Sequence, residues 1–417
     1  MVIRKSFVKY GCYFINFAMS MVAIVSPILF LTFNKEYNIS FALLGTLVLI
    51  NFFTQMTVDL ILSFFSNKFN IKFLIRVMPY LVILGFLIYA LIPLFFKPYA
   101  YLGLAIGTVL FSMANGLVEV LITPLIENLY SENRESEVSK LHSIYGWGVV
   151  VVTVISTLFL RFLGSENWHY LVLLLLIIPI TSCVFFSLTD LPDISSEETG
   201  KNADNPLKNG GVWLCFFAMV FAGMAECTMS QWSSSFMEKA LSLPKVLGDI
   251  LGVAFFAGMV GLGRTLYSKF GKNVISVLIY GSMLATVCYF VCAISGIAVI
   301  GLISCAVTGL AVSMLWPGTL LFASSNNKNS GVVLFALMAA AGDMGAAIGP
   351  QIVGSIIDTA LSSNYFLDLS VTLNISIESL AMRFGLLIAT IFPLLSTVFA
   401  IILKGKYISK ENKKKDK

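Results

Sequence analysis

Residues 168–188 read WHYLVLLLLIIPITSCVFFSL, and this stretch contains no Lys, Arg, Asp or Glu. Its centre, residues 171–177, would be apolar on every face of a helix, unlike a surface helix, which keeps one polar side. Because an α-helix rises about 1.5 Å per residue, about 20 such residues cross the roughly 30 Å hydrocarbon layer of a bilayer. A strand of a membrane β-barrel would alternate apolar and polar residues instead. The stretch therefore predicts a transmembrane helix.

Stretches of the same kind recur along the whole chain of 417 residues and predict twelve transmembrane helices. The composition agrees, because 58% hydrophobic residues, 12% charged residues and a mean hydropathy of +0.90 are untypical of water-soluble proteins. The first stretch is too long for the core of a signal peptide, so we expect it to be retained. The fold class predicted is an all-α integral membrane protein. Its approximate spans are 10–32, 42–65, 73–95, 100–129, 140–162, 168–188, 211–237, 247–269, 274–293, 297–322, 330–357 and 380–403.

A long polar segment, LPDISSEETGKNADNPLKNG at residues 191–210, lies between the sixth and seventh predicted helices. A weak internal repeat surrounds it, because Gly116 precedes Pro124 by the same spacing as Gly309 precedes Pro317. Parallel six-helix repeats are known from transporter folds. We therefore predict two pseudo-symmetric six-helix bundles. The predicted parts are an N-terminal bundle at 1–190, a cytoplasmic linker at 191–210, a C-terminal bundle at 211–403 and a basic cytoplasmic tail at 404–417.

Basic residues are distributed unequally between the predicted loops. Lys and Arg favour the cytoplasmic side of membrane proteins, and an even number of spans puts both termini on one side. The N-terminus, the even-to-odd connections and the tail hold all the basic residues except Lys35, Lys97, Arg161, Lys239, Lys245 and Arg383. We expect both termini in the cytoplasm of a multi-pass cell-membrane protein. The tail suits anionic lipid rather than nucleic acid.

The sequence lacks the residues that several classes of function require. Only two histidines occur, His142 and His169, and the seven cysteines all fall within predicted helices, so we expect no metal centre, no disulfide framework and no cofactor. No G-x4-G-K-[ST] loop is present, which disfavours ATP-driven pumping. No loop is long enough to hold a catalytic domain. We therefore do not expect an enzyme.

The loops after the second and eighth predicted helices are similar to each other, with NKFNIK at residues 67–72 and SKFGK at 268–272. They resemble a degenerate form of the GxLaDrxGrr loop of the major facilitator superfamily. Ser63, Asn67 and Asn70 replace the expected Gly, Asp and Gly in the first copy. The resemblance extends over essentially the whole chain and implies a transporter that works by alternating access. It also implies a gating or inter-bundle role for Lys68 and Lys269.

Other segments resemble the sugar-porter branch around fucose permease and bacterial glucose/galactose permeases. LHSIYGWG at residues 141–148 is similar to the LH-x-x-[FY]-x-x-G stretch of that branch. Glu226, Trp232 and Phe236 resemble its E-x5-W-x3-Y pattern. The resemblance implies sugar transport, but that branch carries an acid in helix one, where this chain has only Asn16 and Ser20, so its proton coupling does not carry over directly. Further residues that support the resemblance are Asn115, Gly116, Glu119, Thr123 and Pro124 in the fourth helix, and Gly342, Asp343, Gly345, Gly349 and Pro350 in the eleventh.

Four acidic residues lie well inside predicted membrane helices, away from the helix ends: Asp59, Glu119, Glu226 and Asp343. A charge at bilayer depth costs several kcal/mol, so these side chains should face the bundle interior or a water-filled cavity. No Lys or Arg lies in the central third of any predicted helix. We therefore expect the acids to lack basic partners and to hold protons readily, which suits proton coupling by Glu119 and Glu226 and disfavours anionic substrates. For Glu119, a purely structural hydrogen bond to a neighbouring helix is the alternative.

Polar and aromatic side chains near these acids are candidate substrate ligands. Asn115 and Thr123 lie one helical turn on either side of Glu119 and share its face. Trp232 is expected either to stack on a sugar ring or to lie at the membrane interface. Pro317 breaks the tenth predicted helix, which would bring freed carbonyls and an aromatic ring to the cavity. The predicted substrate-binding residues are Asn115, Thr123, Gln231, Trp232, Trp316 and Asn16.

The remaining polar residues suggest gating or contacts between the bundles. Gln55 and Asp59 lie in the cytoplasmic half of the second predicted helix. Asp343 lies among the Gly and Ala residues of 339–349, where small side chains let helices approach closely, and we expect it to hydrogen-bond across a helix interface. His142 begins the fifth helix, where an interfacial histidine and a proton relay are both possible.

These features favour secondary active, proton-coupled uptake (symport) of a small neutral solute, a sugar, by a protein that functions as a monomer. The alternative is a drug/proton antiporter that exports lipophilic cations. Unpaired acids would suit it, although the fifth helix lacks the G-x3-G-P-x2-G-G motif of such exporters. A membrane receptor or enzyme that transports nothing is the third possibility.

Overall fold

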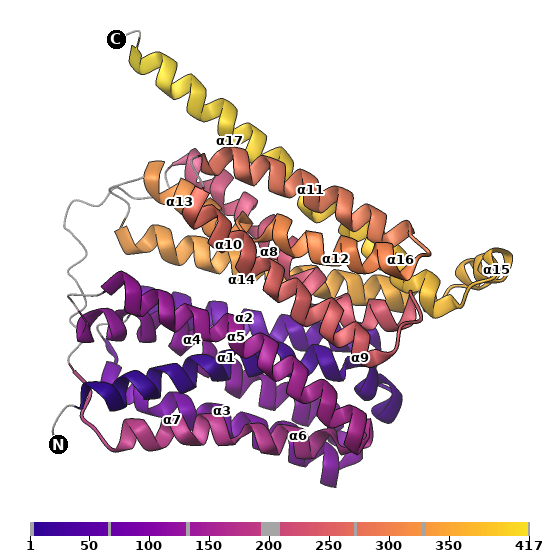
Figure 1. Cartoon of the computed structure of the whole chain (residues 1–417), viewed down its shortest axis with the longest axis horizontal. Helices are drawn as coiled ribbons and strands as arrows, with labels where there is room; N and C mark the ends of the chain where they lie inside the picture. The colour runs from indigo at the N-terminus through magenta and orange to yellow at the C-terminus, as the bar shows by residue number, and fades with distance from the viewer. Residues whose placement is uncertain are drawn as a thin grey trace. The chain divides into compact units, whose positions relative to one another are not determined.

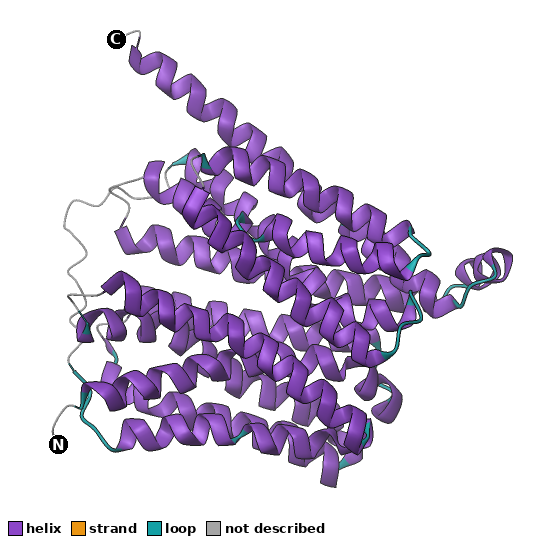
Figure 2. Cartoon of the chain, viewed as in Figure 1, coloured by secondary structure: helices purple, strands orange, loops and turns teal. Residues whose placement is uncertain are grey.

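The computed structural model describes residues 4–65, 68–130, 134–192, 209–270, 273–326 and 331–415. Within these ranges every regular element is a helix (Figure 2). Twelve helices among them are long and apolar enough to cross a membrane, from Lys5–Tyr37 to Ile377–Lys406. The predicted all-helical class with twelve spans is therefore confirmed. The chain divides into two compact units, Met1–Glu198 and Thr199–Lys417, which we call unit 1 and unit 2.

Unit 1 is built around helix α4, which packs along both α3 and α2, while α1 packs along α5 and α7 (Figure 1). Close approach of α3 and α4 depends on two glycines. A Cβ on Gly85 would lie 2.9 Å from the carbonyl oxygen of Gly107, and one on Gly107 would lie 2.7 Å from that of Gly85. The helices of unit 1 are α1 (Lys5–Tyr37), α2 (Phe41–Phe65), α3 (Ile71–Phe95), η2 (Lys97–Tyr99), α4 (Ala100–Leu129), α5 (Arg134–Leu163), η3 (Ser165–Asn167), α6 (Trp168–Leu175) and α7 (Ile177–Ser187).

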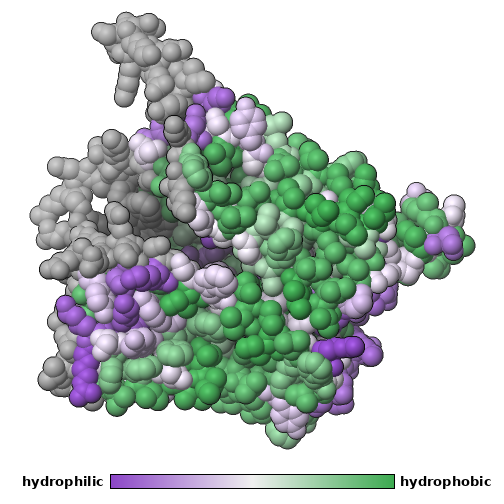
Figure 3. Space-filling model, viewed as in Figure 1, coloured by the Kyte–Doolittle hydropathy of each residue, from purple (hydrophilic) through white to green (hydrophobic). Residues whose placement is uncertain are grey.

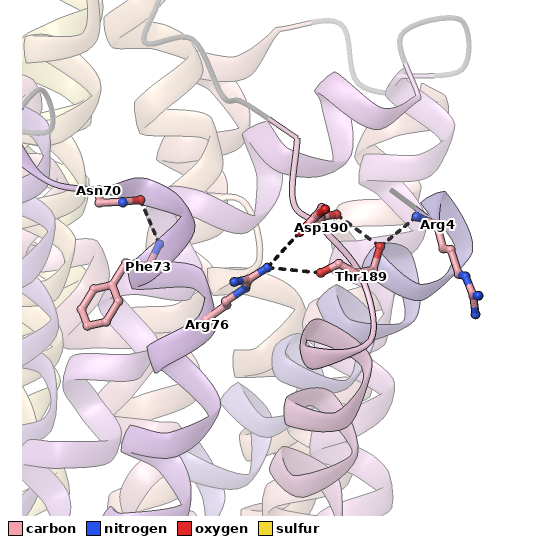
Figure 4. A network of polar contacts seen from close by, with 6 residues as sticks. All are labelled: Arg4, Asn70, Phe73, Arg76, Thr189 and Asp190. Carbon is pink, nitrogen blue, oxygen red and sulfur yellow. Dashed lines mark hydrogen bonds and ion pairs between the residues drawn. The ribbon is translucent and has the colours of Figure 1, made fainter. Parts of the chain in front are cut away.

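A polar clasp joins three helices where the last helix of unit 1 ends (Figure 4). The backbone N–H of Arg4 donates to Thr189 Oγ1 at 2.8 Å, just before α1. From α3, Arg76 Nη2 donates to the carbonyl oxygen of Thr189 at 3.3 Å and lies 3.6 Å from Asp190 Oδ1. The clasp therefore fixes the point at which the chain leaves α7, next to the starts of α1 and α3.

Unit 2 is built around helix α8, which packs along α14 and α17. Its second span is composite, because α9, the π-helix η5 and α10 follow one another without a break, and its fourth span is divided into α12 and α13. The helices of unit 2 are α8 (Gly210–Lys239), α9 (Lys245–Leu247), η5 (Gly248–Ala254), α10 (Phe255–Phe270), α11 (Val274–Ile294), α12 (Ala298–Val312), α13 (Leu315–Asn326), α14 (Gly331–Leu361), α15 (Asn364–Leu373), α16 (Ile377–Ala389) and α17 (Ile391–Lys415).

Small residues bring α8 and α14 into backbone contact. A Cβ on Gly345 would overlap the carbonyl oxygen of Val220, and one on Gly223 would overlap that of Gly342. A Cβ on Gly349 would lie 2.6 Å from Thr228 Oγ1. The close helix approach expected around Asp343 is therefore confirmed.

On the face shown in Figure 3, the surface is largely apolar and hydrophilic residues gather near the helix ends. Helix α15 was not expected from the sequence. It follows the eleventh span and exposes Tyr365 and Val371, which are 71% and 76% accessible. A short helix with exposed apolar side chains beside a membrane span is typical of a segment that lies in the membrane interface.

Candidate functional site

The two predicted acids of unit 1 lie next to each other. Asp59 on α2 is 2% exposed, whereas Glu119 on α4 is exposed. A carboxylate oxygen of each lies within 4.8 Å of the other. Two negative charges at this distance repel each other, so a cation bound between them, of which the proton is the smallest, stabilises the pair.

Gly116 allows this pair to form. A Cβ at this position of α4 would lie 2.9 Å from Val58 Cβ and 3.0 Å from the carbonyl oxygen of Gln55, both on α2. It would also lie 3.1 Å from Asp59 Oδ1. Glu119 lies one turn further along α4, on the same face of the helix. The absent side chain of Gly116 therefore lets α2 bring Asp59 alongside Glu119.

A buried cluster of amide and hydroxyl groups in unit 1 begins one helical turn before Asp59, at Gln55. Ser112 Oγ on α4 and Asn51 Oδ1 on α2 are 2.6 Å apart, with the hydroxyl donating. Gln55 Nε2 donates to the same oxygen at 3.0 Å. Gln55, a predicted gating residue, thus uses its amide within its own unit. Sequence reasoning missed Asn51 and Ser112, although each lies about one turn from a polar residue that it did select.

The other predicted substrate ligands of unit 1 differ in their surroundings. Asn115 is buried and Thr123 is half-buried, both on α4 near Glu119. Asn16 is buried on α1, and its Nδ2 donates to the carbonyl oxygen of Leu141 at 2.7 Å. This bond ties α1 to the start of α5, which gives Asn16 a structural task.

In unit 2, the acid Glu226 has a basic partner. Arg264 Nη2 on α10 donates to Glu226 Oε1 on α8 at 3.2 Å. The expectation that the membrane acids lack basic partners is therefore wrong for Glu226. Arg264 lies near the end of its helix, but its long side chain carries the guanidinium to the neighbouring helix. The side chains are 46% exposed for Arg264 and 17% for Glu226.

The predicted break in the tenth span is present beside this ion pair. Helix α12 ends at Val312 and α13 begins at Leu315. Pro317 has no N–H, so the carbonyl oxygen of Ser313 loses the donor that a continuous helix would supply. Arg264 Nε donates to that oxygen at 3.1 Å.

The two predicted tryptophans have different environments. Trp316 is half-buried at the start of α13, and its ring lies so close to Gly342 of α14 that a Cβ there would overlap it. Trp232 is only 2% exposed, and its Nε1 donates to the carbonyl oxygen of Pro350 at 3.0 Å. Both predictions for Trp232, a stacking platform and an interfacial residue, assumed an exposed ring, whereas the ring is buried and its N–H is bound to α14; its contact with a solute stays a prediction.

The remaining candidates are distributed over both units. Asp343 and Gln231 are buried on α14 and α8. Lys68 is exposed, and its ammonium lies 5.0 Å from the ring centroid of Phe65. The side chains of His142 and Lys269 lie outside the described part of the chain.

Sequence reasoning also missed a buried acid in unit 2. Asp249 lies in the π-helix η5 and is 0% exposed. Its Oδ1 accepts a hydrogen bond from Ser234 Oγ and lies 3.2 Å from Lys245 Nζ. An acid within an otherwise apolar run of residues 247–254 was the available signal, and π-helical turns often occur at functional sites.

Comparison with known proteins identifies the family. The family model of the Major Facilitator Superfamily matches residues 10–350. No curated protein matches the chain. Similar solved structures include a bacterial homolog of the human lysosomal transporter Spinster in an inward-facing, unoccupied conformation, with a TM-score of 0.72, 13% identity and coverage of 97% of this chain and 98% of that one.

The nucleoside transporter NupG gives a TM-score of 0.70 at 12% identity, with 97% and 98% of the two chains covered. An auto-inhibited peptide transporter of the POT family gives 0.68 at 10%, with 95% and 96% covered. At these identities the structures show a common fold and no particular branch or substrate. The chain belongs to the major facilitator superfamily and is a secondary transporter of the membrane, not an enzyme.

Proposed function

We propose that the protein couples a proton gradient to the uptake of a small neutral, polyhydroxylated solute, with a sugar as the first candidate. The observation that carries the coupling is the pair of carboxylates formed by Asp59 and Glu119. Because Glu119 is exposed and Asp59 is buried, a proton taken up from water by Glu119 would reduce the repulsion between them. The uptake and release of that proton would then accompany the conformational cycle.

The proposed solute class rests on the charge balance of the ion pair in unit 2. Arg264 and Glu226 together carry no net charge, yet they offer N–H donors and a carboxylate acceptor, the two groups that hydroxyls bind. The half-buried ring of Trp316 adds an apolar face against which a sugar ring packs. A solute with a net charge would have to compete with one partner of the pair. Asn115 and Thr123, on either side of Glu119, are the proposed ligands of unit 1.

Export of lipophilic cations in exchange for protons is the second candidate function. The same two carboxylates favour it, because an organic cation would be attracted to them as a proton is. The two candidate functions differ in the order in which the protein binds the solute and the proton. A symporter loads solute and proton together, whereas an antiporter loads them in turn.

The deciding experiment is transport into proteoliposomes that contain the purified protein. Radiolabelled sugars, and nucleosides because the NupG structure is named for them, are offered with and without an inward proton gradient. A sodium gradient without a pH difference forms a separate arm, because a metal cation would also stabilise two carboxylates. We expect accumulation of at least one sugar that depends on the proton gradient. No accumulation of any neutral solute would contradict the proposal.

The matched variant is Glu119→Gln, which keeps the shape of the side chain and removes its charge. It should abolish proton-driven accumulation and leave solute counterflow intact, because counterflow needs no net proton movement. Unchanged accumulation would remove Glu119 from the coupling mechanism. Efflux of a lipophilic cation from the same vesicles, driven by protons, would instead favour the antiporter.

A further inference from the structure

Pro317 interrupts the backbone hydrogen bonding of the tenth span. Pro317 cannot donate to the carbonyl oxygen of Ser313, four residues earlier. The next helical hydrogen bond is present, because Gly318 N donates to the carbonyl oxygen of Met314 at 2.8 Å. A carbonyl without a donor inside a membrane protein is costly, so another group must satisfy Ser313.

A side chain from α10 supplies the missing donor. Arg264 Nε is 3.1 Å from the carbonyl oxygen of Ser313. The preceding residue makes the approach possible, because a Cβ on Gly263 would overlap the side chain of Ser313 and lie 3.1 Å from the carbonyl oxygen of Leu310. The two residues therefore act together. Gly263 leaves room for α10 to approach the break, and Arg264 donates the hydrogen bond that Pro317 cannot.

The guanidinium is held at a second point. Its Nη2 donates to Glu226 Oε1 at 3.2 Å, from a different nitrogen than the one that binds Ser313. A planar guanidinium places two N–H groups at fixed positions, which a lysine ammonium does not. Arg264 thus connects the charge of Glu226 on α8 to the backbone of the broken span.

We propose that Arg264 is a positioning residue that replaces the backbone donor missing at Pro317, and so fixes the break of the tenth span and the ring of Trp316 just beyond it. This role does not depend on the identity of the transported solute or of the coupling ion. It predicts a specific compensation. Pro317→Ala restores an N–H that can donate to Ser313 from within the helix, so Arg264 becomes dispensable at this place.

Hydrogen–deuterium exchange of the full-length protein in lipid nanodiscs tests the proposal without any substrate. Arg264→Gln should speed exchange in peptides that span residues 309–320 by about tenfold, the scale of one charge-assisted hydrogen bond. Adding Pro317→Ala to Arg264→Gln should return exchange there to the wild-type rate or below. Arg264→Lys should resemble Arg264→Gln at the break, because one ammonium cannot reproduce both contacts.

Arg383→Gln is the matched control. Arg383 is also a guanidinium of unit 2 that binds backbone carbonyls, with Nη1 2.8 Å from Ser295 O and Nη2 2.9 Å from Ala240 O. Residue 299, four residues after Ser295, is a valine, so no proline creates that acceptor, and Ala240 caps the end of α8, where the helix stops with or without Pro244. Its removal should speed exchange near residues 240 and 295 and not at 309–320, and Pro317→Ala should not reverse it.

Three results would overturn the proposal: unchanged exchange at 309–320 in Arg264→Gln, a uniform increase over all of unit 2, or failure of Pro317→Ala to reverse the effect. If Arg264→Gln alone does not fold, recovery of folded protein by Pro317→Ala supports the proposal and non-recovery overturns it. Failure of the sugar or proton assays would leave these results unaffected.

Discussion

The two units handle an acid at membrane depth in opposite ways. In unit 1, Glu119 lies beside a second carboxylate, Asp59, and two like charges at this distance repel each other. In unit 2, Glu226 lies beside Arg264, so its charge is balanced within the protein. A repeated six-helix plan therefore does not repeat its chemistry. We infer a division of tasks between the acids, with ion uptake by the acid pair of unit 1 and hydrogen bonding to a neutral solute by the ion pair of unit 2.

The largest expected effect comes from neutralising the acid of each unit in turn. Glu119→Gln should abolish proton-driven accumulation, as described above. Glu226→Gln should keep the dependence on the proton gradient, because the pair in unit 1 is intact, but should raise KM by about 10- to 100-fold through loss of a charged hydrogen-bonding partner. The measurement is initial uptake against solute concentration, at fixed gradient.

An exchange of the two phenotypes would refute the division of tasks. If Glu226→Gln abolished coupling and Glu119→Gln changed only KM, the proton would have to bind in unit 2. The double variant Glu226→Gln with Arg264→Gln is the control for an unpaired guanidinium. It removes both charges, so it should be more stable to heat than Arg264→Gln alone, which leaves the carboxylate of Glu226 without its basic partner.

Backbone contacts between helices give the next largest effect. Gly345→Ala would place a Cβ on the carbonyl oxygen of Val220, and we expect α8 and α14 to separate at a cost of about 3 kcal/mol. Gly107→Ala in unit 1, with contacts at 2.7 Å, should cost about half as much. Gly261→Ala is the control, because its Cβ would meet nothing within 4 Å. Thermal unfolding in detergent ranks the three, and equal melting temperatures for all of them would contradict the expected close contacts.

The features that the sequence predicted correctly are those set by local covalent structure or by long runs of residues. Twelve apolar stretches predict twelve spans because the bilayer imposes a length. The break at Pro317 was predictable because a proline lacks its N–H in every context. The glycines of α14 indicated close packing because the missing side chain is itself the cause.

The features that the sequence did not predict depend on which side chains meet in space. Arg264 lies outside the central third of its predicted helix, where no basic partner for an acid was expected, yet its length lets it reach Glu226 on another helix. Trp232 was placed at an exposed position, but the face of α8 that carries it packs against α14. Position along a helix does not specify which neighbour a side chain contacts, and one sequence gives no pairings between helices.

The ion pairs near the helix ends also differ between the two units, in how far water reaches them. In unit 1, Glu137 at the start of α5 is 2.5 Å from Lys9 of α1 and 2.8 Å from Lys140. Hydrogen bonds from Lys140 and Lys9 lower the pKa of Glu137 to about 2. Because the folded-state pKa lies below the unfolded value near 4.5, the stabilisation is present above about pH 4.5 and is lost as the pH falls toward 2.

Glu137→Gln should therefore destabilise the protein at pH 7 by about 1 kcal/mol, a value reduced because Lys140 is largely exposed. The difference from wild type should shrink as the pH falls from 4.5 toward 3. Thermal unfolding over this pH range measures it. A difference that stays constant with pH would mean that the charge of Glu137 does not stabilise the contact between α1 and α5.

The smallest effect is expected for the corresponding kind of contact in unit 2. Lys239 Nζ of α8 lies 2.7 Å from Glu378 Oε2 of α16, but the two side chains are 30% and 48% exposed, so water competes for both charges. Lys239→Gln should change stability by less than about 0.5 kcal/mol, with little dependence on pH above 5, because exposed pairs contribute little. Glu378→Gln is the reciprocal control and should give the same small value. If either variant cost as much as Glu137→Gln, burial would not be what separates the two contacts, and the difference between the units would be confined to the acids inside the membrane.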